Sequence, residues 1–101
     1  MRLGRYPATM DTFEVLDRIR SIPPGRVAAY SDVTPHAPRL AGQVLSASHE
    51  PDLPWHRVVR ADGSLAKGDR QKELLVAEGV RFVGDRVDMA RFRVRCGSSA
   101  T

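Results

Sequence analysis

The residues of this chain that are best suited to chemistry lie in one short stretch, PWHRV at positions 54–58. His56 carries an imidazole, the side chain that most often acts as a general base. Trp55 offers a large aromatic face and an N–H donor but no nucleophilic atom. The only thiol, Cys96, lies far away near the C-terminus without a neighbouring histidine to activate it. Without further context, Trp55 would most often be a core anchor rather than a functional residue.

Composition excludes several classes of protein. The chain has 101 residues, 42% hydrophobic and 28% charged, which is typical of one soluble domain. A single cysteine rules out an internal disulfide and a cysteine-based metal cluster, and we predict neither a metal nor a cofactor. No apolar run is long enough to span a membrane, and the N-terminus lacks an apolar signal region. A cytoplasmic protein without a membrane partner is expected.

The positive charge is carried almost entirely by arginine. Arg outnumbers Lys 14 to 2, the net charge is +4 and the isoelectric point is about 10.0. Guanidinium groups bind phosphate in a bidentate manner and stack on bases, which favours a nucleic-acid partner. An arginine-rich genome would give the same composition, so composition alone leaves both interpretations open.

The elements that would position these residues are mostly helical. Residues 1–10 show no period and are expected to be a loose lead-in. Asp11 and Glu14 form a capping-box pattern, which predicts a helix that ends at the PPG sequence of 23–25. Its apolar residues recur at helical spacing: Phe13, Leu16 and Ile19. Ser31 is expected to cap a second, brief helix through Val33.

A third helix is predicted over residues 38–47, beginning with Pro38. Its apolar side consists of Leu40, Ala41, Val44 and Leu45. Its other side consists of Arg39, Gly42, Gln43 and Ser46. A glycine inside a helix costs about 1 kcal/mol relative to alanine, so Gly42 indicates that a partner approaches the backbone there. Together with the preceding short helix, this is a helix-turn-helix pattern.

The remainder predicts a strand or irregular segment at 55–59, a helix from Asp69 through Glu78 that Gly79 ends, and a strand pair around 84–85. Residues 91–101 are expected to be a basic, Ser-rich tail whose arginines are solvated. The domain then spans residues 11–90. The fold class predicted is mainly α, a winged helix-turn-helix-like DNA-binding domain with minor short β-strands.

Four motifs then match a known family in order: IPPGRVAAYSDV, RLAGQVL, PWHRVVRADGSLAKG and LLVAEGV. Over residues 11–83 the chain resembles the DNA-binding domain of O6-alkylguanine-DNA alkyltransferases. Those enzymes carry Pro-Cys-His-Arg-Val, and Trp55 stands where their nucleophilic cysteine would be. The substitution resembles the alkyltransferase-like proteins, which bind O6-alkylguanine in DNA without repairing it and pass the site to nucleotide excision repair.

The resemblance implies a role for each matching residue. Trp55 and Pro54 would line the alkyl pocket. His56 and Glu78 match the enzyme's activating pair, which without a thiol is expected to be a structural hydrogen bond beneath the pocket. Arg39 matches the finger that fills the gap left by the flipped nucleotide, and Tyr30 matches the residue that rotates the lesion's phosphate.

The same resemblance places Gly42, Gln43 and Ser46 on the surface that faces the minor groove, and makes Arg57 a structural or phosphate contact. The chain departs from the family at Gly68, where some relatives carry an arginine against the alkylated base. Lys67 or Arg70 is expected to substitute for that arginine.

The sequence thus predicts a non-enzymatic monomer that recognises O6-alkylguanine in duplex DNA by flipping the nucleotide into a Trp-lined pocket. Nucleotide excision repair damage-recognition proteins are the expected protein partners. Two alternatives stay open: an active alkyltransferase with another acceptor, for which Cys96 is the only thiol, and a helix-turn-helix regulator that reads sequence in the major groove. Gly42 and the small residues around it argue against the regulator, because a sequence reader needs longer donors and acceptors.

Overall fold

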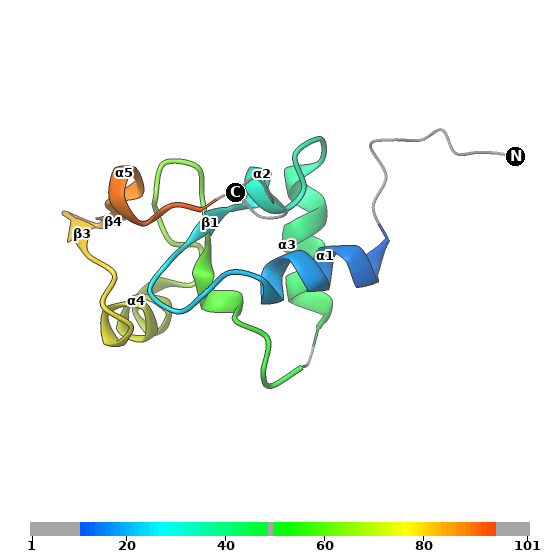
Figure 1. Ribbon diagram of the computed structural model, residues 1–101, viewed down its shortest axis with the longest axis horizontal. Coiled ribbons are helices and arrows are strands. Elements are labelled where there is room, and N and C mark those ends of the chain that lie inside the picture. The colour runs from blue at the N-terminus through cyan, green and yellow to red at the C-terminus, as the bar shows by residue number, and fades with distance from the viewer. Residues whose placement is uncertain (1–10, 49, 95–101) are drawn as a thin grey trace, which may run out of the picture.

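The computed structural model describes residues 11–48 and 50–94 (Figure 1). Helix α1 (Thr12–Arg20) begins with the predicted capping box, in which the Glu14 N–H donates to Asp11 Oδ1 at 2.9 Å. Its buried residues are Val15, Leu16 and Ile19. Phe13 is 82% exposed, so its assignment to the apolar face was wrong. Val15 lies four residues before Ile19, so the two share the buried face of the helix, and Phe13 lies outside that face.

The helix-turn-helix consists of α2 (Tyr30–Val33) and α3 (Pro38–Ala47). Helix α2 begins two residues earlier than predicted, with Ala29 rather than Ser31 at the N-cap. The Asp32 carboxylate accepts a hydrogen bond from the Ala29 N–H at 2.9 Å. Helix α3 begins at Pro38 as predicted, and its apolar residues pack against the core, with Ala41 and Val44 buried.

Four two-residue strands complete the fold. Strand β1 (Ala28–Ala29) pairs in parallel with β2 (Val58–Val59), and Ala28 lies opposite Val58. Strands β3 (Phe82–Val83) and β4 (Arg86–Val87) form the predicted antiparallel hairpin. Gly84 makes its turn with a φ of 63°, a left-handed conformation that glycine tolerates best. This hairpin is the wing of a winged helix-turn-helix.

A 3₁₀ turn, η1 (Trp55–Arg57), leads into β2, and helix α4 (Gly68–Ala77) follows it. Helix α4 begins at Gly68 rather than after Asp69. Lys67 occupies the N-cap position, and the Asp69 side chain does not cap the helix. The end is as predicted, because Gly79 adopts a φ of 93° just beyond the last turn.

The domain extends at its C-terminal end beyond the predicted boundary at residue 90. Helix α5 (Met89–Phe92) is followed by Val94, whose N–H donates to the Val27 carbonyl at 2.7 Å. Arg93 makes two hydrogen bonds to the Asp32 carboxylate, at 2.7 and 2.8 Å. Arg93 is exposed, as expected for a solvated arginine, but this ion pair attaches it to α2, so it does not lie in a free tail. Residues 1–10, Arg95 and Cys96 lie outside the described residues.

Two adjoining apolar clusters form the core. One joins α1, α2 and α3 through Val15, Ile19 and Val33, and the other joins α4 and the hairpin through Leu75 and Val87. The architecture is mainly α with a small wing, as predicted. Within the described segments no helix is long and apolar enough to cross a membrane.

Candidate nucleic-acid interface

A small pocket lies where four elements meet. Its volume is about 180 Å³, and the described residues that line it are Tyr30, Leu45, Trp55 and Lys67. They come from α2, α3, η1 and the N-cap of α4. Three of the four present aromatic or aliphatic surface, and Lys67 adds one positive charge. The pocket suits a small, flat, largely apolar ligand.

The pocket opens onto a broader groove along α3. This groove, which we call the α3 groove, has a volume of about 680 Å³ and shares Tyr30, Leu45 and Lys67 with the pocket. Its other lining residues are Arg39, Gly42, Gln43, Ser46, Ala47 and Ala66. The four residues predicted for the outer side of α3 therefore lie together on one surface.

Gly42 lies in the α3 groove beside Tyr30. A Cβ added to Gly42 would meet its nearest atom, Tyr30 Cε1, at 4.0 Å, which is an ordinary contact. The φ angle of Gly42 is not in the left-handed region. The fold would thus accommodate alanine at this position. Because glycine has no side chain, the α3 groove is open at this position and the helix backbone is accessible to a ligand.

The 3₁₀ turn determines where Trp55 lies. Pro54 is buried at the N-cap of η1, and its carbonyl accepts a hydrogen bond from the Arg57 N–H at 3.1 Å. The His56 ring packs against the Trp55 indole edge-on, with centroids 5.8 Å apart and planes at 83°. Trp55 is only partly buried and forms a pocket wall, rather than filling the core.

Behind the pocket, Glu78 joins several polar groups. His56 Nε2 donates to Glu78 Oε2 at 2.9 Å, and the Gly25 N–H donates to Oε1 at 3.3 Å. Arg57 donates to both carboxylate oxygens, at 3.0 and 2.7 Å, and to the Ile22 carbonyl at 2.9 Å. The Glu78 side chain is 19% exposed and that of Arg57 is 15% exposed. Neither His56 nor Glu78 lines the pocket.

This network keeps Glu78 ionised over a wide pH range. Burial raises the pKa of Glu78, but the hydrogen bonds from Arg57, His56 and the Gly25 N–H outweigh burial and lower it to about 2. The guanidinium of Arg57 is occupied on three sides by protein acceptors. These contacts fit the structural one of the two roles expected for Arg57, and its place among the DNA-binding residues stays a prediction.

Comparison with known proteins agrees with this geometry. The family model described as "6-O-methylguanine DNA methyltransferase, DNA binding domain" matches residues 12–80. The chain is 36% identical over 87 residues to Alkyltransferase-like protein 1 of Schizosaccharomyces pombe, covering 72% of this chain and 81% of that protein. The chain belongs to the alkyltransferase-like family.

Two further proteins are similar to this alkyltransferase-like protein, one in sequence and one in fold. It is 38% identical over 86 residues to the DNA base-flipping protein of Escherichia coli, covering 74% of this chain and 67% of that protein. Its fold matches the crystal structure of S. pombe Atl1 in complex with damaged DNA containing O6-carboxymethylguanine. That match has a TM-score of 0.69 and 26% identity, and covers 93% of this chain and 98% of the other.

The structure distinguishes the two candidates for the arginine that this alkyltransferase-like protein lacks at Gly68. Lys67 lines both the pocket and the α3 groove. Arg70 is exposed in the first turn of α4 and lines neither of them. Lys67 is therefore the better placed of the two.

Three contributors were missed at the level of sequence. Leu45 lines the pocket, although the helical pattern assigned it wholly to the core side. Arg60 lies close enough to Tyr30 for its charge to affect the hydroxyl: burial raises the pKa of Tyr30, and Arg60 partly offsets this. Gln71 is fully buried and connects the two sides of the pocket. Only Gln71 gave a signal, as a polar residue on the apolar side of its helix.

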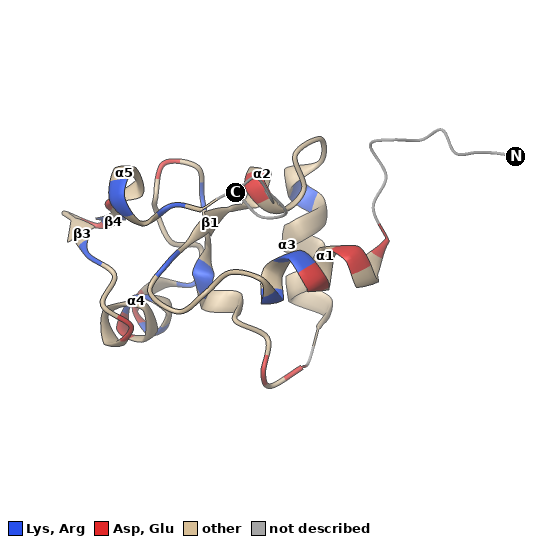
Figure 2. Ribbon diagram, in the orientation of Figure 1, with Lys and Arg blue, Asp and Glu red and all other residues tan. Residues whose placement is uncertain are grey.

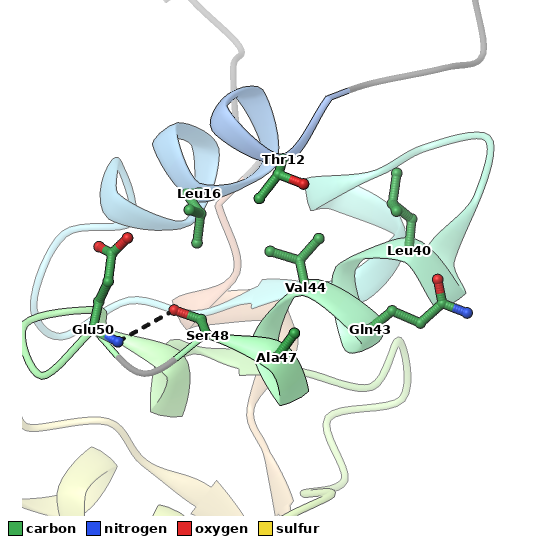
Figure 3. Close-up of a pocket in the computed structure, with 8 residues that line it drawn as sticks. All are labelled: Thr12, Leu16, Leu40, Gln43, Val44, Ala47, Ser48 and Glu50. Carbon is green, nitrogen blue, oxygen red and sulfur yellow. Dashed lines mark hydrogen bonds between the residues drawn. The ribbon is translucent and has the colours of Figure 1, made fainter.

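A second groove lies on the other side of α3, against α1, and has a volume of about 410 Å³. Figure 3 shows Leu16 from α1 and Val44 from α3 on its facing sides. Helix α1 carries both acidic and basic residues, whereas Arg39 is the only charged residue of α3 itself (Figure 2). The charged residue that lines this second groove is Glu50, whereas Arg39 and Lys67 line the α3 groove. The α3 groove is thus the better of the two for a polyanion. No group of acidic, histidine or cysteine side chains in the described residues has a geometry that could hold a metal.

Proposed function

We propose that this protein recognises O6-alkylguanine in duplex DNA without removing the alkyl group. The observation that carries the proposal is the position of Trp55. By the resemblance of its motif, Trp55 would stand where the family's enzymes carry their nucleophilic cysteine, and it forms a wall of a pocket that shares lining residues with the α3 groove. An indole provides a flat apolar surface against which an alkyl group packs, but it accepts no alkyl group.

Recognition would begin with α3 in the minor groove. The minor groove of DNA is about 6 Å wide, so the small side chains at Gly42 and Ser46 would allow the helix backbone to approach the bases. Arg39 lies in the first turn of the same helix, where a cation is unfavourable next to the helix dipole and no acidic residue is present. A stacked position between bases would account for an arginine at this point.

The flipped nucleotide would then enter the pocket. Tyr30 stands between the pocket and the α3 groove, where it would rotate the lesion's phosphate, and Trp55 would contact the alkyl group. Flipping costs a few kcal/mol and costs less for a base pair already weakened by alkylation. Beneath the pocket, the bonds of His56 and Arg57 to Glu78 would hold η1 in place. The E. coli relative is named for base flipping, which supports this order of events.

The decisive experiment measures the fate of the lesion. The protein is incubated with a duplex containing one O6-methylguanine, the duplex is digested to nucleosides, and the protein is mapped by mass spectrometry. We expect the lesion to be recovered unchanged and the protein to keep its mass. Recovery of guanine with a methylated Cys96 would establish the alkyltransferase alternative, and Cys96→Ala would then abolish the transfer.

A regulator that reads sequence is separated from a lesion receptor by binding at fixed salt. The lesion duplex and its undamaged counterpart differ by one alkyl group, so a receptor binds the lesion duplex more tightly in several sequence contexts. Tight binding to one undamaged sequence, with no effect of the alkyl group, would instead support the regulator.

We further propose that the protein acts as a monomer inside the cell and passes the bound site to nucleotide excision repair. The alkyl group stays on the base, so a second system must remove it. Light scattering of the complex should give one protein per lesion. In a reconstituted excision repair reaction, adding the protein should increase incision at O6-alkylguanine, and Arg39→Ala should not.

A further inference from the structure

We propose that the Trp55 pocket prefers O6-alkyl groups that end in a carboxylate, and that Lys67 determines this preference. The inference rests on the proposed function and concerns which lesions the pocket selects. It follows from the charge of the pocket wall and from the way in which that wall is fixed.

The first observation is the composition of the pocket. Lys67 is its one charged lining residue, and the described residues that line it include no carboxylate. Tyr30, Leu45 and Trp55 provide surface for the methylene part of an alkyl group, but none of them carries a charge that would compensate an anion. A carboxylate that entered this pocket without a cation nearby would lose hydration with little in return. Lys67 supplies that cation.

The second observation is that Lys67 is held at a fixed place relative to Trp55. Gln71 is fully buried, and its side-chain oxygen accepts a hydrogen bond from the Lys67 N–H at 3.0 Å. Its Nε2 donates to the carbonyls of His56 and Val58, at 3.0 and 2.8 Å. One side chain therefore joins the backbone of Lys67 to the segment that carries Trp55.

The third observation is that Arg60 adds positive potential on the Tyr30 side. Burial raises the pKa of the Tyr30 hydroxyl, and the charge of Arg60 opposes this. The Arg60 side chain also donates to the Leu65 carbonyl at 3.4 Å, which holds it along the loop before Lys67. A second cation, which does not itself line the pocket, thus acts on Tyr30, one of the pocket walls. This favours an anion over a neutral group of the same shape.

The size of the effect is limited because Lys67 is exposed. Ion pairs in contact with solvent contribute up to about 1 kcal/mol, so we expect a preference of about three- to fivefold in Kd for the anion. The preference should weaken as salt concentration rises.

The test uses two lesions of the same shape. One duplex contains O6-carboxymethylguanine, and the other contains O6-carbamoylmethylguanine, in which an amide replaces the carboxylate. The sequence is otherwise identical, so contacts with the DNA phosphates cancel in the ratio of the two Kd values. Wild-type protein should bind the carboxymethyl duplex about three- to fivefold more tightly.

Variants assign the preference to one residue. Lys67→Met keeps a long side chain without the charge, and its ratio should fall to one or reverse, since the carboxylate then lies in a pocket with no adjacent cation. Lys67→Arg should keep the preference. Arg70→Met, which removes a charge close by in sequence but outside the pocket, is the matched control and should not change the ratio.

Failure of this inference is distinct from failure of the proposed function. Equal Kd values for the two lesion duplexes, each tighter than for undamaged DNA, would overturn the preference and leave lesion recognition intact. The same holds if Lys67→Met and Arg70→Met change the ratio equally. If neither lesion duplex is bound more tightly than undamaged DNA, the proposed function itself fails.

Discussion

Two arginines close to the pocket, Arg57 and Arg39, have opposite surroundings. Arg57 lies beneath the pocket and donates to Glu78 and to the Ile22 carbonyl. Arg39 lies exposed in the α3 groove and makes no hydrogen bond or ion pair with any residue in the described part of the chain. In the network of Glu78, His56 and Arg57, which we call the Glu78 network, the charged groups bond to one another and stabilise the site. In the α3 groove, the charge of Arg39 is available to a ligand. Mutations in the two regions should therefore affect different measurements.

The largest effect is expected in the Glu78 network. Glu78→Gln removes a carboxylate that accepts from Arg57, His56 and a backbone N–H, and hydrogen bonds to charged groups contribute about 1.5 to 3 kcal/mol. We expect the free energy of unfolding to fall by about 2 to 3 kcal/mol and Tm by about 10 to 20 °C. Thermal unfolding measures the change, with Glu73→Gln on the exposed side of α4 as the control. Because these bonds hold η1, lesion affinity measured well below Tm should fall somewhat, but less than with Arg39→Ala; an equal or larger loss of affinity would show that the two regions are not separable.

The same network predicts a dependence of stability on pH. The folded pKa of Glu78, about 2, is below its unfolded value of 4.5, so its contribution is complete above about pH 4.5 and is lost as pH falls toward 2. Urea unfolding of wild type and Glu78→Gln should give a constant difference from pH 7 to 5 that narrows below pH 4.5. A difference that stayed the same down to pH 2 would show that ionised Glu78 is not its source.

In the α3 groove, Arg39→Ala should change binding and not stability. Stacking on a base contributes about 1 to 3 kcal/mol, so the Kd for a lesion duplex should rise about 5- to 100-fold while Tm is unchanged. Arg93 is unsuitable as a control, because it is paired with Asp32 next to Tyr30. Arg81, exposed between α4 and β3, is the better one. Equal losses for Arg39→Ala and Arg81→Ala would indicate only a general charge effect.

The smallest substitution tests the groove most directly, because it should move stability and binding in opposite directions. Gly42→Ala should raise the free energy of unfolding by about 1 kcal/mol, since alanine favours a helix and its Cβ meets only Tyr30 Cε1 at 4.0 Å. In the complex the same methyl group would crowd the DNA, and we expect about a tenfold weaker lesion affinity. Ser46→Ala adds no bulk and is the control. A variant that is more stable and binds normally would show that α3 does not approach the DNA at Gly42.

Local signals in the sequence were enough to predict much of this fold. The capping box predicted α1, Pro38 and the apolar pattern predicted α3, and Gly84 predicted the hairpin turn. Each of these depends on residues within one or two turns of each other. The outer side of α3 was predicted for the same reason, and its residues do lie in one groove.

What could not be predicted depends on residues far apart in the chain. Arg57 and Arg39 both lie within motifs shared with the family, and the motifs do not show which of the two is paired. Pairing depends on the folded position of Glu78, which bonds to Arg57. Arg93 looked like part of a basic tail, because its partner, Asp32, is 61 positions away. Strands of two residues have no detectable period, so β1 and β2 could not be paired in advance. Whether the groove binds DNA depends on a partner that the fold alone does not contain.

The parallel pair of β1 and β2 has a consequence for how the pocket comes into being. It joins residues thirty positions apart, Ala28 to Val58, while Val27 bonds to the segment 92–94 on its other side. Tyr30 follows the first strand and Trp55 precedes the second, so the two walls meet only after a long loop has closed, a slow and non-local step. A peptide containing only α2 and α3 would therefore hold the groove-facing helix but no pocket. Under the proposed function, recognition of the lesion would be a property of the completed domain, and separating β1 from β2 would release the flipped base.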